Sequence, residues 1–382
     1  MKKIYKMAIE ERISFLKQMG LPEKALENIK YKTALSNDQI DHFIENGIGQ
    51  IEIPLGLATD FLINGREYLV PMATEEPSVV AAASNGAMRI KKSGGFISNI
   101  ENEYMIGQII FDKLQNPDLF AKKLDSSKKI LFELAEKVNP RAVKRGDGLK
   151  KIIFHQNTKN DWIELRIASQ QSMGANLIDS IAEKIKNWIE NNLLTKNDDV
   201  LAAILSNSSK KKIVHLSGKV SFDDLKTRQM TGEKVAEKIA ALSGFAKINN
   251  ERRATDFKGM LNGIEAVCLA TANDTRAVTA SLLESYQKPD SKLVEWFLGT
   301  DNFLRFKADI PMPVGVIGGA INYLPYSKYS LELLGKPKAE ELMSITACVG
   351  VANNLAATRA LVTEGIQAGH MPLQNKRKEM QK

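Results

Sequence analysis

The segment between residues 105 and 206 carries the pattern that most restricts the fold of this chain. Its apolar residues alternate in four short stretches and recur at helical spacing in two long ones. Strands are predicted at 105–111, 151–155, 162–168 and 200–205, and helices at 118–138 and 175–193. The resulting order of strand, helix, strand, strand, helix and strand is that of a ferredoxin-like βαββαβ unit. It differs from the strictly alternating order of a Rossmann domain.

The two helices of this unit are predicted from one-sided apolar spacing. In the second helix the apolar positions recur every three or four residues, at Leu177, Ile178, Ile181, Ile185, Trp188 and Ile189. The first helix is expected to end at Asn139-Pro140. A chain of 382 residues is too long for one compact core, so we expect a second domain beside this unit and an α+β fold overall.

The flanking segments show a less regular pattern. The first fifty residues alternate helical spacing with turns. Further strands are predicted at 51–55, 68–72, 213–222 and 266–270, with a strand and turn at 61–66 and a further helix at 232–243. The polar segment 206–212 is expected to bridge the two domains.

The composition is that of an ordinary soluble globular protein, with 43% hydrophobic and 26% charged residues. No apolar run approaches the roughly 18 residues that span a bilayer, and the charged N-terminus lacks the apolar core of a signal peptide. Cys268 and Cys348 form no C-x-x-C pair, which favours a reducing compartment without a disulfide or a zinc site. The sequence therefore predicts a cytoplasmic protein with no metal and no membrane partner.

The net charge of +8 leaves two interpretations open. It reflects either a lysine-rich proteome or a field that attracts polyanions, such as nucleic acids, phosphorylated cofactors or coenzyme A. A nucleic-acid-binding protein is the weaker hypothesis, because the chain lacks an aromatic-lined basic stretch and any known reader motif. We expect no nucleic-acid partner.

Four ionisable residues stand in segments otherwise built from small apolar residues: Glu76, Lys258, Asp274 and His370. A carboxyl group at a helix start is either a charged cap or a proton donor. Lys258 either snorkels to solvent or holds a positive charge at a developing oxyanion. Asp274 either caps the following helix or is a reactive group at a strand end. His370, like most single histidines, has a structural role as its simpler interpretation.

Glycines mark further candidate positions. S-M-G-A-N at 172–176 leads into a helix whose first N–H groups can bind phosphate. Gly259 and Gly263 would let the backbone near Lys258 approach a ligand. V-G-V-I-G-G-A at 314–320 lacks the complete G-x-G-x-x-G spacing. The absence of Walker A, H-E-x-x-H and G-x-S-x-G motifs argues against P-loop NTPases, zincins and serine hydrolases.

Several of these segments together resemble the class II hydroxymethylglutaryl-CoA reductases, the soluble form of bacteria and archaea. They are T-E-E-P-S-V-V-A-A-A-S at 74–84, M-G-A-N at 173–176, K-G-M-L-N-G-I-E-A-V at 258–267, A-T-A-N-D-T-R-A-V at 270–278 and G-I-Q-A-G-H-M at 365–371. E-N-G-I-G at 45–49 and P-M-P-V-G-V-I-G-G-A at 311–320 also fit the family pattern. The resemblance extends from about residue 40 to residue 372.

The resemblance implies a four-electron reduction in the mevalonate pathway. The thioester of hydroxymethylglutaryl-CoA would become mevalonate and free CoA, with two nicotinamide hydrides consumed and no metal involved. Lys258 would stabilise the hemithioacetal oxyanion, and Glu76 would protonate the mevaldehyde oxygen. Asp274 would hold both charges in register. His370 would protonate the departing CoA thiolate.

The resemblance also implies binding residues and a domain arrangement. The hydroxymethylglutaryl group would lie among Ser78, Arg252, Thr255 and Asn262, with Arg252 suited to the free carboxylate. The cofactor would contact Asn139, Gln171, Met173, Gly174, Ala175 and Asn176. A large α/β CoA-binding domain would comprise 1–104 and 213–369, with a small nicotinamide-binding domain inserted at 105–212 and the remnant of a C-terminal flap at 370–382. The active site would form between the subunits of a homodimer, with higher oligomers open.

The chain departs from the family pattern at several places. Gln171 replaces an acid, Ala272 replaces a glycine, and Asp256 and Phe257 stand where the family has His-Asn. Only 12 residues follow His370, where the family has a helical flap, so we expect a more open site. These departures support one alternative function, a catalytically impaired relative that binds CoA or nicotinamide without efficient turnover.

The resemblance also bears on cofactor choice. Family members that prefer NADH have an acid after the first helix of the small domain, where this chain has Asn139. Basic residues flank that position: Lys137, Arg141, Lys144 and Arg145. A carboxylate repels the 2′-phosphate of NADPH, so its absence together with these cations predicts a preference for NADPH over NADH. The alternative interpretation is that Asn139-Pro140 only ends the helix and that the basic residues near it are solvated and bind no phosphate.

Overall fold

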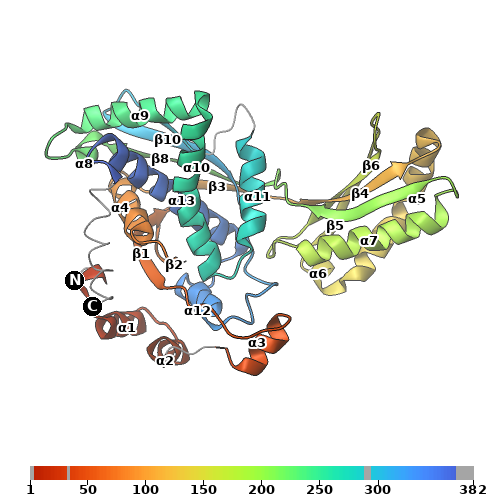
Figure 1. Cartoon of the computed structure of the whole chain (residues 1–382), viewed down its shortest axis with the longest axis horizontal. Helices are drawn as coiled ribbons and strands as arrows, with labels where there is room; N and C mark the ends of the chain where they lie inside the picture. Colours follow the sequence, from red (N-terminus) through yellow and green to blue (C-terminus); the bar gives the residue numbers. More distant parts are fainter. Residues whose placement is uncertain (1–3, 32–34, 288–293, 367–382) are drawn as a thin grey trace.

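The computed structural model describes residues 4–31, 35–287 and 294–366. These residues form two parts that lie side by side (Figure 1). A ferredoxin-like unit lies at one end, and a larger body contains the other two sheets and most of the helices. This mixture of helices and sheets confirms the predicted α+β class. His370 lies outside the described residues.

The ferredoxin-like unit has the predicted order of elements. It comprises β4 (Met105–Lys113), α5 (Pro117–Val138), α6 (Pro140–Lys144), β5 (Gly148–His155), β6 (Trp162–Ala168), α7 (Ala175–Asn192) and β7 (Asp199–Ser206). Its sheet is antiparallel in the order β5-β6-β4-β7. The short helix α6 was not predicted. Apolar residues of α5 and α7, such as Leu131 and Ile185, are fully buried in the core of this unit.

The larger body contains a hairpin and a second four-stranded sheet. Its strands are β1 (Leu55–Ile63), β2 (Arg66–Ala73), β3 (Ile97–Asn102), β8 (Lys212–Ser221), β9 (Glu295–Leu298) and β10 (Phe303–Pro311). β1 pairs with β2, and the other strands form an antiparallel sheet in the order β3-β8-β10-β9. The ferredoxin-like unit is inserted between β3 and β8. Because these strands are neighbours, the chain leaves and re-enters the larger body at one place.

One long helix, α13 (Ala339–Val362), forms the centre of the larger body. The other helices are η1 (Ile4–Lys6), α1 (Ile9–Gln18), α2 (Glu23–Tyr31), α3 (Asn37–Phe43), α4 (Val79–Lys92), α8 (Phe222–Leu225), α9 (Gly232–Ile248), α10 (Asn250–Ala270), α11 (Thr275–Tyr286) and α12 (Pro325–Leu333). α13 is long and apolar enough to cross a membrane, but 67% of its most apolar stretch is buried inside the protein. Its apolar character is therefore explained by its place in the core.

Glycines allow α13 to pack closely against both α4 and α10. A Cβ on Gly86 of α4 would lie 2.1 Å from the backbone oxygen of Ala352, which is far inside contact distance. A Cβ on Gly263 of α10 would lie 2.9 Å from the side chain of Val349. The close neighbour of Gly263 is thus a core helix, so the expectation that this glycine admits a ligand is wrong.

Two predicted strands are also wrong. Residues 266–270 form the last turns of α10, not a strand, because the small apolar residues there pack at helical spacing in the core. Residues 51–54 lie outside any strand, and β1 begins only at Leu55. Ile51 is almost fully exposed, which shows that the apolar alternation there does not mark a buried strand face.

Substitution of Gly86 by alanine tests the close packing of α4 on α13. We expect the added methyl group to force the helices apart and to lower the free energy of unfolding by about 1–3 kcal/mol, the usual cost of overpacking. Urea unfolding followed by circular dichroism measures this loss. The matched control is Gly244→Ala in α9, where a Cβ meets nothing within 4 Å and helix propensity predicts a gain of up to about 1 kcal/mol. A gain in both variants would contradict the close packing.

Candidate active site

Lys258 and Glu76 form the centre of the candidate site. Lys258 lies in the middle of α10, and Glu76 lies in the turn between β2 and α4. The Lys258 ammonium is 3.0 Å from one Glu76 carboxylate oxygen and 3.3 Å from the other. Both side chains remain open to solvent, at 60% and 38% exposure. The structure thus brings together two residues that are far apart in the sequence and leaves them accessible to a substrate.

Four of the predicted residues follow one another on one face of α10. Arg252, Thr255, Lys258 and Asn262 are three or four positions apart, which places them along a single stripe of the helix. The opposite face, which includes Ile264 and Val267, is buried. α10 therefore presents a polar face with Lys258 at its middle.

Glu265 extends this polar face by one turn and was not singled out from the sequence. Burial raises the pKa of Glu265, the nearby Glu75 carboxylate raises it further, and the positive charge of Lys258 opposes both effects. Its spacing of seven residues from Lys258 was the signal that could have identified it. The site therefore contains a carboxyl group that retains its proton to a higher pH than an ordinary glutamate.

Asp274 has a structural role that is visible in the fold. It is the N-cap of α11, and its Oδ1 accepts hydrogen bonds from the backbone N–H groups of Arg276 and Ala277. Burial alone would raise the pKa of Asp274, but the Arg276 guanidinium and these amides lower it below its usual value. Within the described part of the chain, no hydrogen bond or ion pair joins Asp274 to Lys258 or Glu76.

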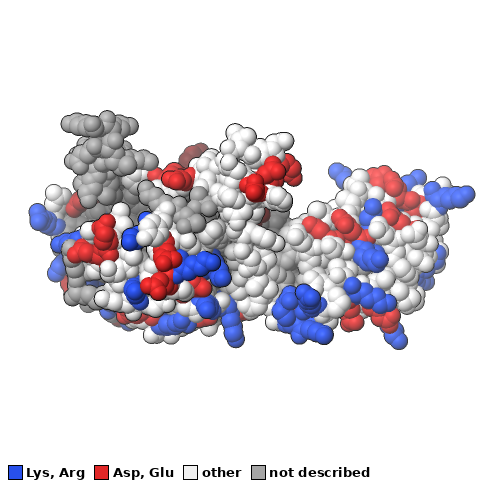
Figure 2. All heavy atoms as spheres, turned by 90° about the horizontal axis from the view of Figure 1, so that it is seen from below, with Lys and Arg blue, Asp and Glu red and all other residues white. Residues whose placement is uncertain are grey.

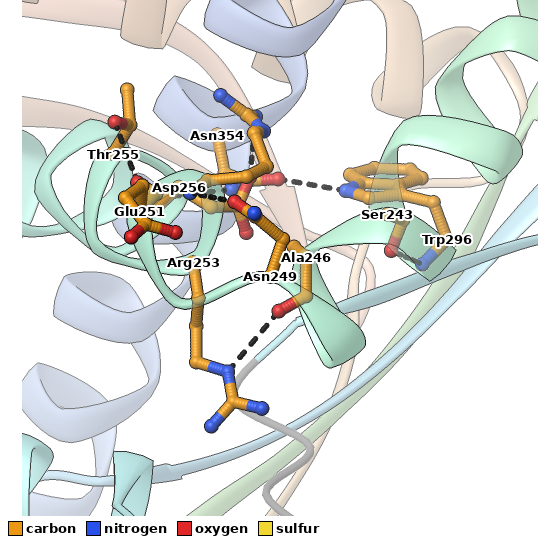
Figure 3. Close-up of polar contacts among 10 residues, drawn as sticks. Ser243, Ala246, Asn249, Glu251, Arg253, Thr255, Asp256, Trp296 and Asn354 are labelled. Atoms are coloured by element: carbon orange, nitrogen blue, oxygen red, sulfur yellow. Dashed lines mark hydrogen bonds and ion pairs between the residues drawn. The ribbon is translucent and has the colours of Figure 1, made fainter.

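Arg252, the candidate for binding a carboxylate, is already paired inside the protein. Its guanidinium donates to Asp256 at 2.9 Å, and both side chains are largely buried. Burial raises the pKa of Asp256, while the charge of Arg252 opposes the rise. Figure 3 shows Asp256 beside Asn354 of α13, whose side-chain oxygen accepts a hydrogen bond from Trp296 Nε1 at 2.8 Å.

The remaining predicted substrate residues lie at helix starts or on the polar face. Ser78 is the N-cap residue of α4 and has a positive φ of 81°, an unusual conformation for a non-glycine residue. The Thr255 hydroxyl donates to the backbone oxygen of Glu251, one turn earlier. Asn262 lies one turn after Lys258 and is partly buried.

The predicted cofactor residues gather at the start of α7, apart from Asn139. Gly174 caps α7 with a positive φ of 98°, and no side chain caps the helix there. Met173 precedes it, and Ala175 and Asn176 form its first turn. Gln171 faces the larger body, where its side-chain oxygen accepts a hydrogen bond from the backbone of Ala339.

Asn139 lies between α5 and α6 and is the N-cap of α6. Its side-chain oxygen accepts a hydrogen bond from the Ala142 backbone, and it caps α6. The predicted helix stop at Asn139-Pro140 is therefore confirmed. Among the described residues, no cluster of three or more His, Cys, Asp or Glu side chains could hold a metal ion.

Comparison with known proteins decides the family. A family model described as hydroxymethylglutaryl-coenzyme A reductase matches residues 8–375. The chain belongs to this family. It is 39% identical to the 3-hydroxy-3-methylglutaryl-coenzyme A reductase of Archaeoglobus fulgidus, over 97% of this chain and 84% of that protein. It is 32% identical to the probable reductase of Borreliella burgdorferi, over 92% of this chain and 81% of that one.

A solved structure of the family has the same fold. The class II 3-hydroxy-3-methylglutaryl-CoA reductase of Streptococcus pneumoniae, bound to NADPH in open conformations, superimposes with a TM-score of 0.88. It is 35% identical, and the match covers 94% of this chain and 98% of that one. The resemblance inferred from the sequence motifs is thus confirmed, and the chain is an oxidoreductase of the hydroxymethylglutaryl-CoA reductase family.

The N-cap of α11 predicts that two Asp274 variants differ in stability. Asp274→Ala removes the cap and should cost about 0.5–2 kcal/mol of unfolding free energy, whereas Asp274→Asn should cost little because asparagine caps as well as aspartate. Thermal unfolding of both variants measures the difference. Arg276→Ala is the control, and it should cost at most about 1 kcal/mol because its side chain is highly exposed. Equal losses in the Ala and Asn variants would contradict the capping role.

Proposed function

We propose that this chain reduces 3-hydroxy-3-methylglutaryl-CoA to mevalonate and CoA with two molecules of NAD(P)H. The observation that carries the proposal is the Lys258–Glu76 pair on the polar face of α10, in a chain that belongs to this reductase family. The pair combines a fixed cation with a carboxyl group within hydrogen-bonding distance. Such a pair can stabilise a developing oxyanion and deliver a proton to it.

The start of α7 fits a phosphorylated nicotinamide cofactor, which would supply the hydride. No side chain caps this helix, so its first N–H groups are available to an anion. A Cβ on Gly174 would lie 2.6 Å from the Ser169 side chain, so only glycine fits here. Gln171, Met173, Gly174, Ala175 and Asn176 would hold the cofactor, as the resemblance implies.

Each catalytic residue would either stabilise a charge or transfer a proton during the reaction. Lys258 would stabilise the oxyanion formed at the thioester carbon. Glu76 would protonate the aldehyde oxygen, and His370 would protonate the CoA thiolate as it leaves. Asp274, the N-cap of α11, would hold the Lys258 and Glu76 charges in register, as the resemblance implies. Glu265 would add a second carboxyl group near Lys258.

The substrate carboxylate would bind at the N-terminal end of the polar face. Arg252 would bind it, with Ser78, Thr255 and Asn262 around the same group. Because Arg252 is already paired with Asp256, the incoming carboxylate must either share the guanidinium with Asp256 or displace Asp256 from it. A guanidinium has five donors, so sharing is compatible with its geometry.

The open site favours an assembly of at least two subunits. Lys258 and Glu76 are both accessible, and a group of exposed apolar side chains surrounds the segment after α3: Phe43, Ile44, Ile48, Ile51, Ile53, Leu55 and Tyr323. The Phe43 and Tyr323 rings contact each other, and large exposed apolar patches commonly mark protein–protein interfaces. We therefore propose a homodimer in the cytoplasm, with the active site completed at the subunit interface.

Replacement of Lys258 by methionine tests the central assignment. We expect kcat/KM for the reduction to fall by about 100- to 1000-fold, because the fixed charge at the oxyanion is lost. Oxidation of NADPH in the presence of hydroxymethylglutaryl-CoA measures the rate. Lys234→Met is the matched control, since Lys234 also pairs with a glutamate, Glu237, and is 59% exposed. Near-normal turnover of the Lys258 variant would overturn the assignment.

The cofactor preference is proposed to be NADPH, and Asn139→Asp tests it. Figure 2 shows Lys and Arg side chains gathered on the ferredoxin-like unit at the end near the larger body, the end at which α6 lies in Figure 1. The new carboxylate should lower kcat/KM for NADPH relative to NADH by about tenfold. It should leave stability unchanged because aspartate caps α6 equally well.

Asn116→Asp is the matched control for this experiment. Asn116 caps α5 in the same way, by accepting a hydrogen bond from the Leu119 backbone. Its substitution should leave the NADPH-to-NADH ratio unchanged. If Asn139→Asp also leaves the ratio unchanged, the residue does not face the 2′ position of the cofactor.

A further inference from the structure

A fully buried lysine, Lys212, lies where the chain returns from the ferredoxin-like unit to the larger body. It is the first residue of β8 and has 0% exposure. Its ammonium donates to the backbone oxygens of Ser169 at 2.5 Å and Ser172 at 3.0 Å. Both acceptors belong to the loop between β6 and α7, so a residue of the larger body holds a loop of the other unit.

Burial of the Lys212 ammonium costs free energy, and the nearby carboxylates offset only part of that cost. Desolvation lowers the pKa of Lys212 to about 8, although the carboxylates of Asp147 and Glu340 oppose the shift. Asp147 belongs to the ferredoxin-like unit and Glu340 to the first turn of α13. An apolar side chain in the same space would leave the Ser169 and Ser172 backbone oxygens without this donor, so the ammonium does more than fill the core.

The loop held by Lys212 is tied to the larger body at further points. The backbone oxygen of Gln171 accepts hydrogen bonds from Val316 and Ile317, and its side-chain oxygen accepts one from Ala339. Asn102 donates to the backbone oxygen of Gln170 at 3.1 Å. Residues 169–173 are therefore a contact point between the two parts of the molecule.

This contact continues to the candidate catalytic residues. A Cβ on Gly315 would lie 2.6 Å from the Ser172 backbone, so the 314–317 segment packs directly on the loop. The Asn273 side chain donates to the Gly315 oxygen and accepts from the Gly315 nitrogen. Asn273 immediately precedes Asp274. One continuous set of contacts thus links the start of α7 to the cap of α11.

We propose that Lys212 is a positioning residue of the reduction, which holds the 169–173 loop so that the first turn of α7 keeps its place relative to the α10 face. The inference rests on the proposed function, in which the start of α7 holds the nicotinamide cofactor. Lys212 touches neither substrate nor cofactor in this scheme. It acts through the backbone of Ser169 and Ser172.

Lys212→Met tests this role, with Lys211→Met as the matched control. Lys211 is the preceding residue, is partly exposed and pairs with Glu101 at the surface. We expect Lys212→Met to raise the KM for NADPH tenfold or more and to accelerate hydrogen exchange of the 169–176 amides, while the KM for hydroxymethylglutaryl-CoA changes little. Lys211→Met should match the wild type. A cofactor KM and exchange pattern equal to those of the control would overturn the proposal.

The unsubstituted protein provides a second test that does not depend on the variant folding. Lys212 is charged below about pH 8 and loses its proton above that pH. The neutral amine is a weaker donor, so exchange of the 169–176 amides, corrected for intrinsic rates, should accelerate as the pH rises from 7 to 9.5. A flat corrected profile would overturn the proposal. This measurement needs no turnover, so it remains decisive even if the proposed reduction fails.

Discussion

The close packing of α13 against both α4 and α10 determines the geometry of the site. Glu76 lies just ahead of α4, and Lys258 lies on α10. Gly86 and Gly263 let both helices approach the same core helix at backbone distance. Protein interiors are packed as densely as organic crystals, so such contacts tolerate little displacement. The 3.0 Å separation of the two charged groups therefore depends on a helix that contributes neither of them.

The electrostatics of the site extend beyond the Lys258–Glu76 pair to two further carboxyl groups. Lys258 lies in the field of Glu76 and Glu265, and Glu75 lies close to Glu265. The Lys258 charge opposes the rise in the pKa of Glu265, but burial and the Glu75 carboxylate outweigh it. Glu265 therefore retains its proton to a higher pH than an ordinary glutamate does. The arrangement places a carboxyl group with a raised pKa and a positive charge close together at an open surface.

The sequence predicted the parts of the fold that depend on local patterns. The βαββαβ unit was found because its strands and helices have distinct periods, and α7 was placed to within one residue. The strand expected at 266–270 was wrong because small apolar residues fit a buried helix as well as a buried strand. Lys212 and Asn273 were missed because their partners lie at distant positions in the sequence. Their roles depend on tertiary contacts, which no local pattern encodes.

The departures at Asp256 and Phe257 are best understood from the geometry of α10. Asp256 pairs with Arg252 and lies beside Asn354 of α13, and the Phe257 ring packs against Tyr286. Asp256 is thus paired with a member of the polar stripe, and Phe257 packs against α11. The two departures change what α10 packs against and which group pairs with Arg252, while the Lys258–Glu76 pair is kept. If Arg252 binds the substrate carboxylate as proposed, the buried Asp256 carboxylate would raise the cost of that binding, so these departures would act on substrate affinity before they act on the chemistry at Lys258.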